Sequence, residues 1–220
     1  MQVVRRIKCV VVFSGGPDSA SAAYWAKDKG FDVHLITFDY GQIAKIEIEH
    51  ARRIAQEMGV THKVVDLSAL ERVYLGITSL VDTGIQMTQE FSAPIIVPFR
   101  NGVFLAVTVA YAASVGVDTI LYGAHGSDEE NYPDCRREFY KAFEATARLG
   151  TETQITIDAP FSNITKAEML KRGLGLGVPL HLTWSCYRNG PIHCGTCESC
   201  NNRRKAFREA GIQDPTEYKT

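Results

Sequence analysis

The sequence lacks the features that mark nucleic-acid-binding, secreted or membrane-spanning proteins. It has no excess of either charge: 24 Lys and Arg residues stand against 25 Asp and Glu residues, which gives a formal net charge of -1 at pH 7. Nucleic acid and anionic membranes attract proteins with an excess of basic residues, so neither is expected as a direct partner. No signal peptide is visible, and no apolar stretch approaches the ~20 residues that cross a bilayer. We therefore expect a cytoplasmic protein.

The sequence also lacks internal repeats, low-complexity tracts and long linkers. Its 220 residues suit one α/β domain with a small appended lobe. Strands are expected near residues 10–13, 33–38, 63–67, 119–122 and 154–157. Helices are expected near residues 19–29, 44–58, 101–115, 133–149, 165–174 and 197–209. We expect 101–115, which is apolar almost all round, to be buried, and 70–94 to form a long excursion with short helices.

This alternation of strands and helices predicts a doubly wound, mainly parallel five-stranded sheet. Ligands of such sheets bind beyond the carboxyl ends of the strands. The loops expected at that edge begin at Ser14, Phe38, Pro98 and Gly123. We place the main domain at residues 1–180 and a small cysteine-rich lobe at residues 181–220.

A glycine-rich turn between the first strand and the first helix is a candidate phosphate site. It reads Ser14-Gly15-Gly16-Pro17-Asp18-Ser19. Glycine lets the backbone approach a phosphate, and N–H groups at a helix N-terminus bind anions, although Pro17 supplies no N–H. Asp18 suits such a site if it holds a magnesium ion that bridges phosphates. The alternative is a tight turn in which Asp18 or Ser19 caps the helix.

Four cysteines lie within fifteen residues near the C-terminus. They are Cys186, Cys194, Cys197 and Cys200. Four thiolates suit a tetrahedral zinc ion, and a closed shell of four sulfurs leaves no open position, so the metal is expected to be structural. The alternatives are two disulfides, or free thiols with His193 as a metal ligand.

The glycine-rich turn resembles the signature Ser-Gly-Gly-x-Asp-Ser of the ATP-pyrophosphatase (PP-loop) superfamily, whose members split ATP between the α and β phosphates. No Gly-Lys-Ser/Thr follows, so the turn is not a Walker loop. The resemblance implies that adenine lies near residues 37–39. It also implies ATP contacts at Phe13, Ser14, Gly15, Gly16, Pro17, Asp18, Ser19, Ala20, Ser21, Ala22 and Ala23.

Four further strings narrow the resemblance to one family within this superfamily, and the resemblance covers essentially the whole chain. The strings are Asp39-Tyr40-Gly41-Gln42, Pro98-Phe99-Arg100-Asn101, Tyr132-Pro133-Asp134-Cys135-Arg136 and Thr183-Trp184-Ser185-Cys186-Tyr187. Together with the cysteine cluster they closely resemble the 7-cyano-7-deazaguanine synthase family of queuosine and archaeosine biosynthesis.

The resemblance implies a ligase that uses ATP, magnesium and ammonia. In the implied reaction, the carboxylate of 7-carboxy-7-deazaguanine attacks the α phosphate of ATP, and ammonia then displaces AMP to give the amide. A second ATP activates the amide oxygen, and loss of that oxygen leaves the nitrile. No nucleophilic side chain is required. The resemblance also implies a homodimer, and one structural zinc ion per subunit.

Three residues are candidates for catalysis. Asp18 is expected to position magnesium, Arg100 to contact phosphate or the substrate carboxylate, and Lys166 to reach a phosphate. The alternatives are a surface ion pair for Arg100 and an exposed helix position for Lys166.

Three more residues are candidates for substrate binding. Tyr132 is expected to stack on the base, Asp134 to accept hydrogen bonds from the N–H edge of the deazaguanine, and Arg136 to hold the carboxylate through two hydrogen bonds. Asp134 can instead be a charge at a helix N-terminus. Cys135 stands between them, and we expect it to be a packing residue rather than a nucleophile.

Three other functions are compatible with parts of the sequence. A tRNA-modifying enzyme of the superfamily needs a basic surface or an RNA-binding domain, which the charge balance and the length disfavour. A related enzyme that joins the activated deazaguanine to another amine remains open, because the loop at 124–130 is acidic. A non-catalytic zinc-binding module leaves the glycine-rich turn unexplained.

Overall fold

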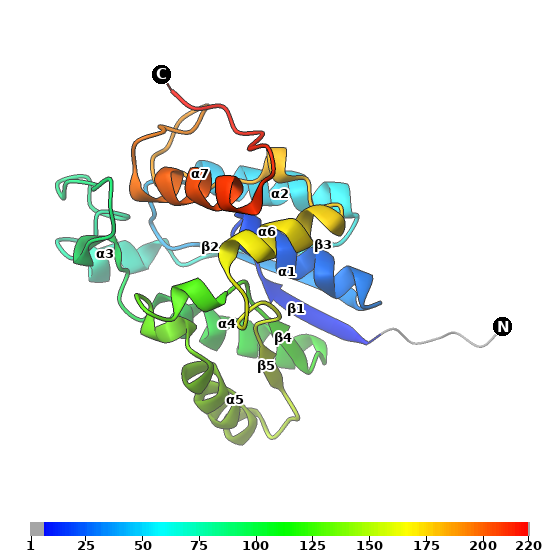
Figure 1. The fold of residues 1–220 in the computed structure, drawn as a ribbon. Coiled ribbons are helices and arrows are strands. Elements are labelled where there is room, and N and C mark those ends of the chain that lie inside the picture. The colour runs from blue at the N-terminus through cyan, green and yellow to red at the C-terminus, as the bar shows by residue number, and fades with distance from the viewer. Residues whose placement is uncertain (1–6, 220) are drawn as a thin grey trace.

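The computed structural model describes residues 7–219 and contains one parallel sheet (Figure 1). Its strands are β1 (Lys8–Val12), β2 (Asp32–Asp39), β3 (Thr61–Asp66), β4 (Thr119–Leu121) and β5 (Thr156–Asp158). They lie in the order β3-β2-β1-β4-β5, and each neighbouring pair is parallel. Because the order reverses at β1, the chain winds in both directions from the centre, and the predicted doubly wound five-stranded sheet is confirmed.

Helices cover both faces of the sheet. They are α1 (Pro17–Asp28), α2 (Ile46–Met58), α3 (Glu71–Tyr74), α4 (Arg100–Val115), α5 (Arg137–Thr151), α6 (Lys166–Gly175) and α7 (Glu198–Ala210). Successive residues of a strand point to opposite faces. Cys9 and Val11 of β1 accordingly pack in one core with α1, α2, α6 and α7, whereas Val10 packs in the other with α4 and α5.

Two expectations about helices are corrected by the structure. The helix expected from Pro133 begins at Arg137, because residues 133–135 form a 3-10 turn and Arg136 is extended, with φ -69° and ψ 148°. The helix α4 is not buried all round: Ala106, Ala110 and Ala113 are exposed. Small apolar residues tolerate water, so composition alone did not distinguish a helix with one buried face from one buried on all sides.

One helical stretch, Ala93–Val115, has the length and the apolar composition of a membrane-crossing segment, which was not expected from the sequence. Its helix α4 places Leu105, Val109 and Ala112 in the core against the sheet. The stretch is thus accounted for as a core helix of the α/β fold.

The excursion between β3 and α4 carries short helices, as expected. These are the 3-10 turns Ser68–Leu70 and Ala93–Ile95, with α3 between them. Tyr74, Leu80, Val81 and Val97 form a small apolar cluster of their own with Tyr40, which follows β2. The excursion is therefore tied to the carboxyl edge of the sheet.

The C-terminal segment returns to the main core. Ala206, Phe207 and Ala210 of α7 pack with residues of α1 and α2. Arg203 is 1% exposed and donates to the Leu180 carbonyl oxygen, 2.9 Å away. The domain boundary between residues 180 and 181 stays a prediction, and the packing joins the two sides of it.

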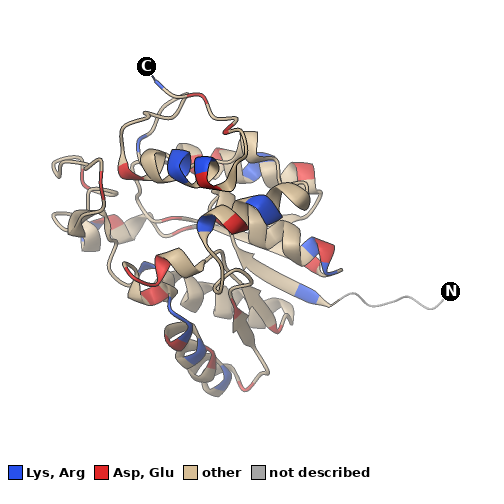
Figure 2. Ribbon diagram, in the orientation of Figure 1, with Lys and Arg blue, Asp and Glu red and all other residues tan. Residues whose placement is uncertain are grey.

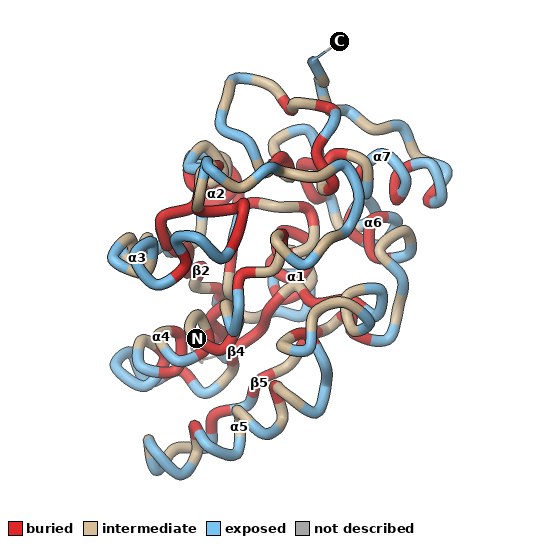
Figure 3. The backbone as a smooth tube through the Cα atoms, turned by 90° about the vertical axis from the view of Figure 1, so that its left-hand side faces the viewer, coloured by how far each residue is buried: buried red, intermediate tan, exposed pale blue. Residues whose placement is uncertain are grey.

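Charge and burial are distributed as in an ordinary globular enzyme. Basic and acidic residues both occur along α5 and α7 (Figure 2). The central strands lie in the buried centre, and the exposed segments lie on the outer sides of the helices and in the loops (Figure 3). Functional residues are therefore expected at the carboxyl edge of the sheet, where ligands of such sheets bind.

Candidate active site

The glycine-rich turn Ser14–Ser19, here called the phosphate turn, lies at the carboxyl end of β1. Gly15 has a φ of +80°, and a Cβ atom there would lie 2.7 Å from the backbone nitrogen of Ala51 and 2.8 Å from the backbone oxygen of Glu47, both in α2. A Cβ atom at Gly123, after β4, would lie 2.7 Å from the backbone nitrogen of Ser19. Only glycine permits these approaches. The turn is therefore held from outside by neighbouring backbone.

Hydrogen bonds inside the phosphate turn leave the start of α1 available to an anion. The Ser14 N–H donates to Ser19 Oγ at 3.2 Å, and Ser19 Oγ donates to the Gly16 carbonyl oxygen at 3.2 Å. Gly16 is the N-cap of α1, and no side chain caps the helix, so neither Asp18 nor Ser19 plays the capping role. Uncapped N–H groups and the helix dipole together favour a phosphate at this position.

A charged cluster lies beside the turn. Lys166 Nζ, at the start of α6, donates to Asp18 Oδ2 at 2.9 Å. The other carboxylate oxygen, Asp18 Oδ1, is buried and has no hydrogen-bond partner among the described residues. His125 Nε2 lies 3.9 Å from Asp18 Oδ1 and 3.5 Å from Asp128 Oδ2. Carboxylate oxygens are the protein ligands that Mg²⁺ prefers, so the free Oδ1 fits the predicted magnesium contact.

The neighbours in this cluster set its charges. Burial raises the pKa of Asp18, but Lys166 and His125 outweigh burial and leave that pKa below its ordinary value. Burial lowers the pKa of Lys166, but the Asp18 and Asp128 carboxylates outweigh it and leave that pKa raised. Burial lowers the pKa of His125, and the Asp18 carboxylate opposes that shift. The cluster thus presents an ionised carboxylate and an ammonium group toward the phosphate turn.

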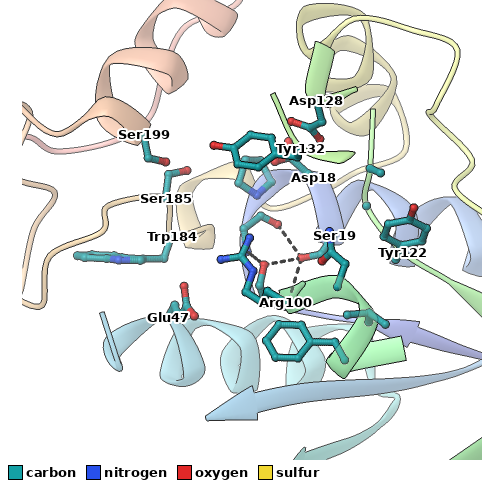
Figure 4. Close-up of a pocket in the computed structure, with 18 of the residues that line it drawn as sticks. Asp18, Ser19, Glu47, Arg100, Tyr122, Asp128, Tyr132, Trp184, Ser185 and Ser199 are labelled. Carbon is teal, nitrogen blue, oxygen red and sulfur yellow. Dashed lines mark hydrogen bonds between the residues drawn. The ribbon is translucent and has the colours of Figure 1, made fainter. Parts of the chain in front are cut away.

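Arg100 and Glu47 lie in the same pocket (Figure 4). Arg100 Nη1 donates to the Tyr40 hydroxyl at 3.4 Å, and the guanidinium lies 5.9 Å from the centre of the Tyr40 ring. Burial raises the pKa of Glu47 to about 7, while the Gln42 amide and Arg100 oppose the shift. Gln42 Nε2 donates to Glu47 Oε1 at 2.8 Å. The pocket therefore holds a cation that can meet a carboxylate or a phosphate.

Residues 184–200, here called the cysteine segment, form the opposite wall of the pocket. The Trp184 N–H donates to the Gly15 carbonyl oxygen at 2.9 Å, which joins this segment to the phosphate turn. Figure 4 shows Trp184, Ser185 and Ser199 on one side and Asp128 and Tyr132 on another. The segment's lining residues are Trp184, Ser185, Tyr187, Glu198 and Ser199, and Asn202 follows them in α7.

The four thiols of the cysteine segment converge on one point. The sulfurs of Cys194 and Cys200 are 3.9 Å apart, those of Cys186 and Cys197 are 3.9 Å apart, and all four lie within 4.8 Å of one another. A disulfide needs about 2.0 Å, so the separations fit four ligands around a metal ion rather than two disulfides. His193 is not among the converging ligands, because its Nε2 accepts the Ser185 N–H at 3.0 Å.

Backbone N–H groups donate to these sulfurs. Cys186 Sγ accepts from the N–H groups of Arg188 and Cys194, both at 3.3 Å, and Cys194 Sγ accepts from that of Cys197 at 3.3 Å. The thiols of Cys197 and Cys200, and then these backbone donors, lower the pKa of Cys186 to about 4 against the effect of burial. Cys186 and Cys197, together with burial, raise the pKa of Cys200 instead. The backbone donors thus favour thiolates, the form that binds metals, at Cys186 and Cys194.

Comparison with known proteins identifies the family. A family model described as "Queuosine biosynthesis protein QueC" matches residues 8–211. The chain belongs to the QueC family. A 7-cyano-7-deazaguanine synthase from Psychromonas ingrahamii is 39% identical over 216 residues, 96% of this chain and 97% of the relative. Another from Methanoculleus marisnigri is 41% identical over 219 residues, 96% of this chain and 98% of the relative.

A solved structure supports the fold of this QueC-family chain. The NMN synthetase from Francisella tularensis matches with a TM-score of 0.52 and 15% sequence identity, over 95% of this chain and 79% of that one. At this identity the likeness concerns the fold alone. It agrees with the doubly wound sheet described above.

The pocket of this QueC-family member gathers nine of the sixteen residues predicted for catalysis, ATP binding or substrate binding. Those that line it are Phe13, Ser14, Gly16, Pro17, Asp18, Ser19, Arg100, Tyr132 and Lys166. The predicted residues outside its lining are Gly15, Ala20, Ser21, Ala22, Ala23, Asp134 and Arg136. Their contacts with ATP or substrate, like the roles of the lining residues, stay predictions.

In the string from Tyr132 to Arg136, some residues line the pocket and others form hydrogen bonds within the surrounding structure. Asp134 Oδ2 accepts the Asn101 N–H at 2.9 Å, at the start of α4, and Arg136 Nε donates to the Glu129 carbonyl oxygen at 2.8 Å. Cys135 lines the pocket but is buried, and burial raises the pKa of its thiol well above its ordinary value. A thiol that stays protonated is a poor nucleophile, which agrees with the packing role.

Several lining residues were not singled out from the sequence. They are Glu47, Tyr187, Glu198 and Asn202; His125, which contacts the charged cluster, was also missed. Glu198 was missed because it lies between cysteines whose spacing was already explained by a metal site. Glu47 was missed because it fits the polar face of an amphipathic helix. The available signal for Glu47 was its place in the first turn of a helix that follows a strand's carboxyl end.

Proposed function

We propose that this protein is an ATP-dependent ligase that converts 7-carboxy-7-deazaguanine and ammonia to 7-cyano-7-deazaguanine. The observation that carries the proposal is a single pocket in which the phosphate turn, the cation of Arg100 and the rings of Tyr132 and Tyr187 meet. A planar acid and a nucleotide triphosphate need these elements side by side. The relatives that share about 40% of the sequence carry the name of this activity.

The reaction proceeds in two activations of the same carbon. One carboxylate oxygen bonds to the α phosphate and pyrophosphate leaves; ammonia then adds to the carbonyl carbon, and AMP leaves with that oxygen. The amide oxygen next bonds to the α phosphate of a second ATP. Loss of AMP and of the remaining N–H proton gives the nitrile. Each turnover therefore consumes two ATP and releases two AMP and two pyrophosphates.

The described residues divide this chemistry among them. The N–H groups at the start of α1 and Lys166 bind the leaving pyrophosphate, where fixed donors act most strongly in the transition state. Arg100 orients the substrate carboxylate, and Tyr132 stacks on the base. Asp18 holds Mg²⁺ through its free Oδ1; when bound, the ion neutralises phosphate charge.

The metal at the cysteine segment is zinc and its role is structural. Four sulfurs about 2.3 Å from a zinc ion at tetrahedral corners lie about 3.8 Å apart. The separations of 3.5 Å between Cys197 and Cys200 and of 3.9 Å between Cys186 and Cys197 bracket that value. Four protein ligands leave no place for substrate.

The protein works in the cytoplasm as a homodimer on a free base, without direct contact to nucleic acid or membrane. The mixed charge of the helices in Figure 2 supports the absence of a nucleic-acid surface. The exposed alanines of α4, with Phe99 at 58% exposure beside its first turn, support a contact between subunits. Sedimentation analysis with and without tRNA tests both statements, and a monomer or a tRNA complex would contradict them.

The deciding experiment uses the substrate labelled with ¹⁸O at both carboxylate oxygens. Incubation with ATP, magnesium and ammonium is expected to give the nitrile and two AMP, each carrying one ¹⁸O. Release of ADP and phosphate, or AMP without label, would overturn the proposed function. Formation of a conjugate when another amine is added, but no nitrile with ammonia alone, would favour the amine-joining alternative.

A further inference from the structure

Three carboxylates line the pocket outside the phosphate turn, and they differ in what their oxygens already bind. Glu47 accepts from Gln42, and Asp128 Oδ2 accepts the His125 N–H at 3.3 Å. Glu198 is 4% exposed, and its Oε2 is buried without a hydrogen-bond partner among residues 7–219. A buried carboxylate oxygen without a donor is unfavourable, which points to a donor supplied by a ligand.

The position of Glu198 is fixed on two sides. Its backbone N–H donates to the Thr88 carbonyl oxygen at 3.1 Å, and its Oε1 accepts from Asn202 Nδ2 one helical turn later. Cys197, one of the four converging thiols, is the N-cap of the same helix. The cysteine cluster therefore sets where the helix begins, and with it where the free oxygen lies in the pocket.

The surroundings of Glu198 suit a flat ring that carries N–H groups. Tyr132 and Tyr187 line the same pocket as Glu198. A guanine-type ring presents N1–H and the 2-amino group side by side on one edge. An ionised carboxylate has about four lone-pair sites and accepts both of these donors at once.

We propose that Glu198 is the residue that selects the guanine-type ring, by accepting hydrogen bonds from its N1–H and 2-amino group. The inference rests on the proposed function. It also gives the cysteine cluster a role beyond stabilising the fold, because the cluster positions the residue that determines specificity. Asp134 is the rival acceptor from the sequence, but its Oδ2 is engaged by the Asn101 N–H and it does not line the pocket.

The test compares two substrates in three proteins. The substrates are 7-carboxy-7-deazaguanine and its analogue with hydrogen in place of the 2-amino group. The proteins are the wild type, Glu198→Gln and the control Glu209→Gln, which makes the same change at an exposed position of α7. AMP formation gives kcat/KM for each pair, and zinc content and thermal unfolding report on folding.

We expect the wild type and Glu209→Gln to prefer the 2-amino substrate by about 100-fold, because the analogue keeps N1–H but lacks the 2-amino donor and leaves a buried carboxylate oxygen unpaired. In Glu198→Gln the preference should fall below about 5-fold, with the KM for ATP and the zinc content unchanged. A wild type that accepts both substrates equally would overturn the inference without recourse to any variant.

Two further outcomes separate the inference from the proposed function. If the wild type forms no AMP from 7-carboxy-7-deazaguanine, the proposed function fails and the inference fails with it. If the wild type turns over but the preference survives in Glu198→Gln and collapses in Asp134→Asn, the proposed function stands and Asp134 is the acceptor.

Discussion

The phosphate turn and the cysteine segment form facing walls of one pocket, but they are ordered in different ways. The turn is fixed by backbone approaches: Gly15 lies against α2, and Gly123 lies against Ser19. The cysteine segment has little regular structure before α7, and four unlinked thiols within 4.8 Å of one another form its centre. The turn is ordered by the fold itself, whereas we expect the segment to be ordered by a metal ion that these four thiols could hold.

This difference separates two functions of the pocket. Phosphate binding requires only the start of α1 and its neighbours, so it should survive damage to the cysteine segment. The recognition of the base proposed above involves Tyr187 and Glu198, two lining residues that the segment carries. The comparison is tested by changes that affect one wall and leave the other intact.

The largest effect is expected at Asp18. Asp18→Asn removes the carboxylate that pairs with Lys166 and presents a free oxygen for Mg²⁺. AMP formation should therefore fall by about 10³-fold. Zinc content should remain that of the wild type, since the cysteine segment does not depend on this carboxylate. Asp28→Asn, at an exposed position of the same helix, is the matched control. Retained turnover would contradict the role given to Asp18, and loss of zinc would show that the two walls are not independent.

The next effect concerns the metal. Cys197→Ser should lose zinc and lower the free energy of unfolding by an amount on the order of 5 kcal/mol. Limited proteolysis should then cut within residues 184–200 and spare α1 and α2, because the turn is held by the sheet. Cys135→Ala removes a thiol outside the cluster and should keep both the zinc and the protection. Equal protease resistance of the zinc-free and wild-type proteins would contradict metal-dependent order.

A smaller effect distinguishes close packing from backbone conformation. Gly15 and Gly59 both have positive φ, +80° and +64°, but a Cβ atom at Gly59 meets nothing within 4 Å. Gly59→Ala should cost only the conformational penalty, about 1 kcal/mol. Gly15→Ala should cost roughly 2–4 kcal/mol and raise the KM for ATP, because the new atom displaces α2. Urea unfolding measures both, and equal costs would show that the turn is not pressed against α2.

The same contrast explains what could be predicted from the sequence. The sheet, its carboxyl edge and the cysteine cluster follow from local patterns, since buried strands, glycine turns and ligand spacings are each written within about fifteen residues. The second wall of the pocket does not follow from local patterns. Trp184 contacts Gly15, 169 positions away in the chain, through a backbone hydrogen bond that residue types do not predict. Glu198 and Glu47 were missed for this reason.

Local patterns also misled in two places. Pro133 often begins a helix, but here the chain makes a 3-10 turn first, and Asp134 caps α4 instead of its own helix. The apolar residues of α4 predicted burial on all sides, but burial depends on what packs against each face. Both errors concern tertiary neighbours rather than helix propensity.

A pH-dependent effect is expected at Glu47, whose backbone lies against Gly15 and whose carboxyl group faces the pocket. Burial raises its pKa to about 7, whereas an unfolded Glu titrates near 4.3. Between these values the folded protein binds more protons than the unfolded chain. The free energy of unfolding should therefore fall as the pH rises through this window, by at most about 4 kcal/mol from this group.

Glu47→Gln isolates that contribution, because the amide keeps the shape and cannot ionise. Urea unfolding at pH 5 and at pH 8 should show a smaller loss of stability in Glu47→Gln than in the wild type. Glu49→Gln changes an exposed residue of the same helix and should leave the wild-type difference unchanged. If all three proteins lose the same stability, the carboxyl group is ionised in the folded state, and the pocket then holds one more negative charge for Arg100 and the magnesium ion to balance.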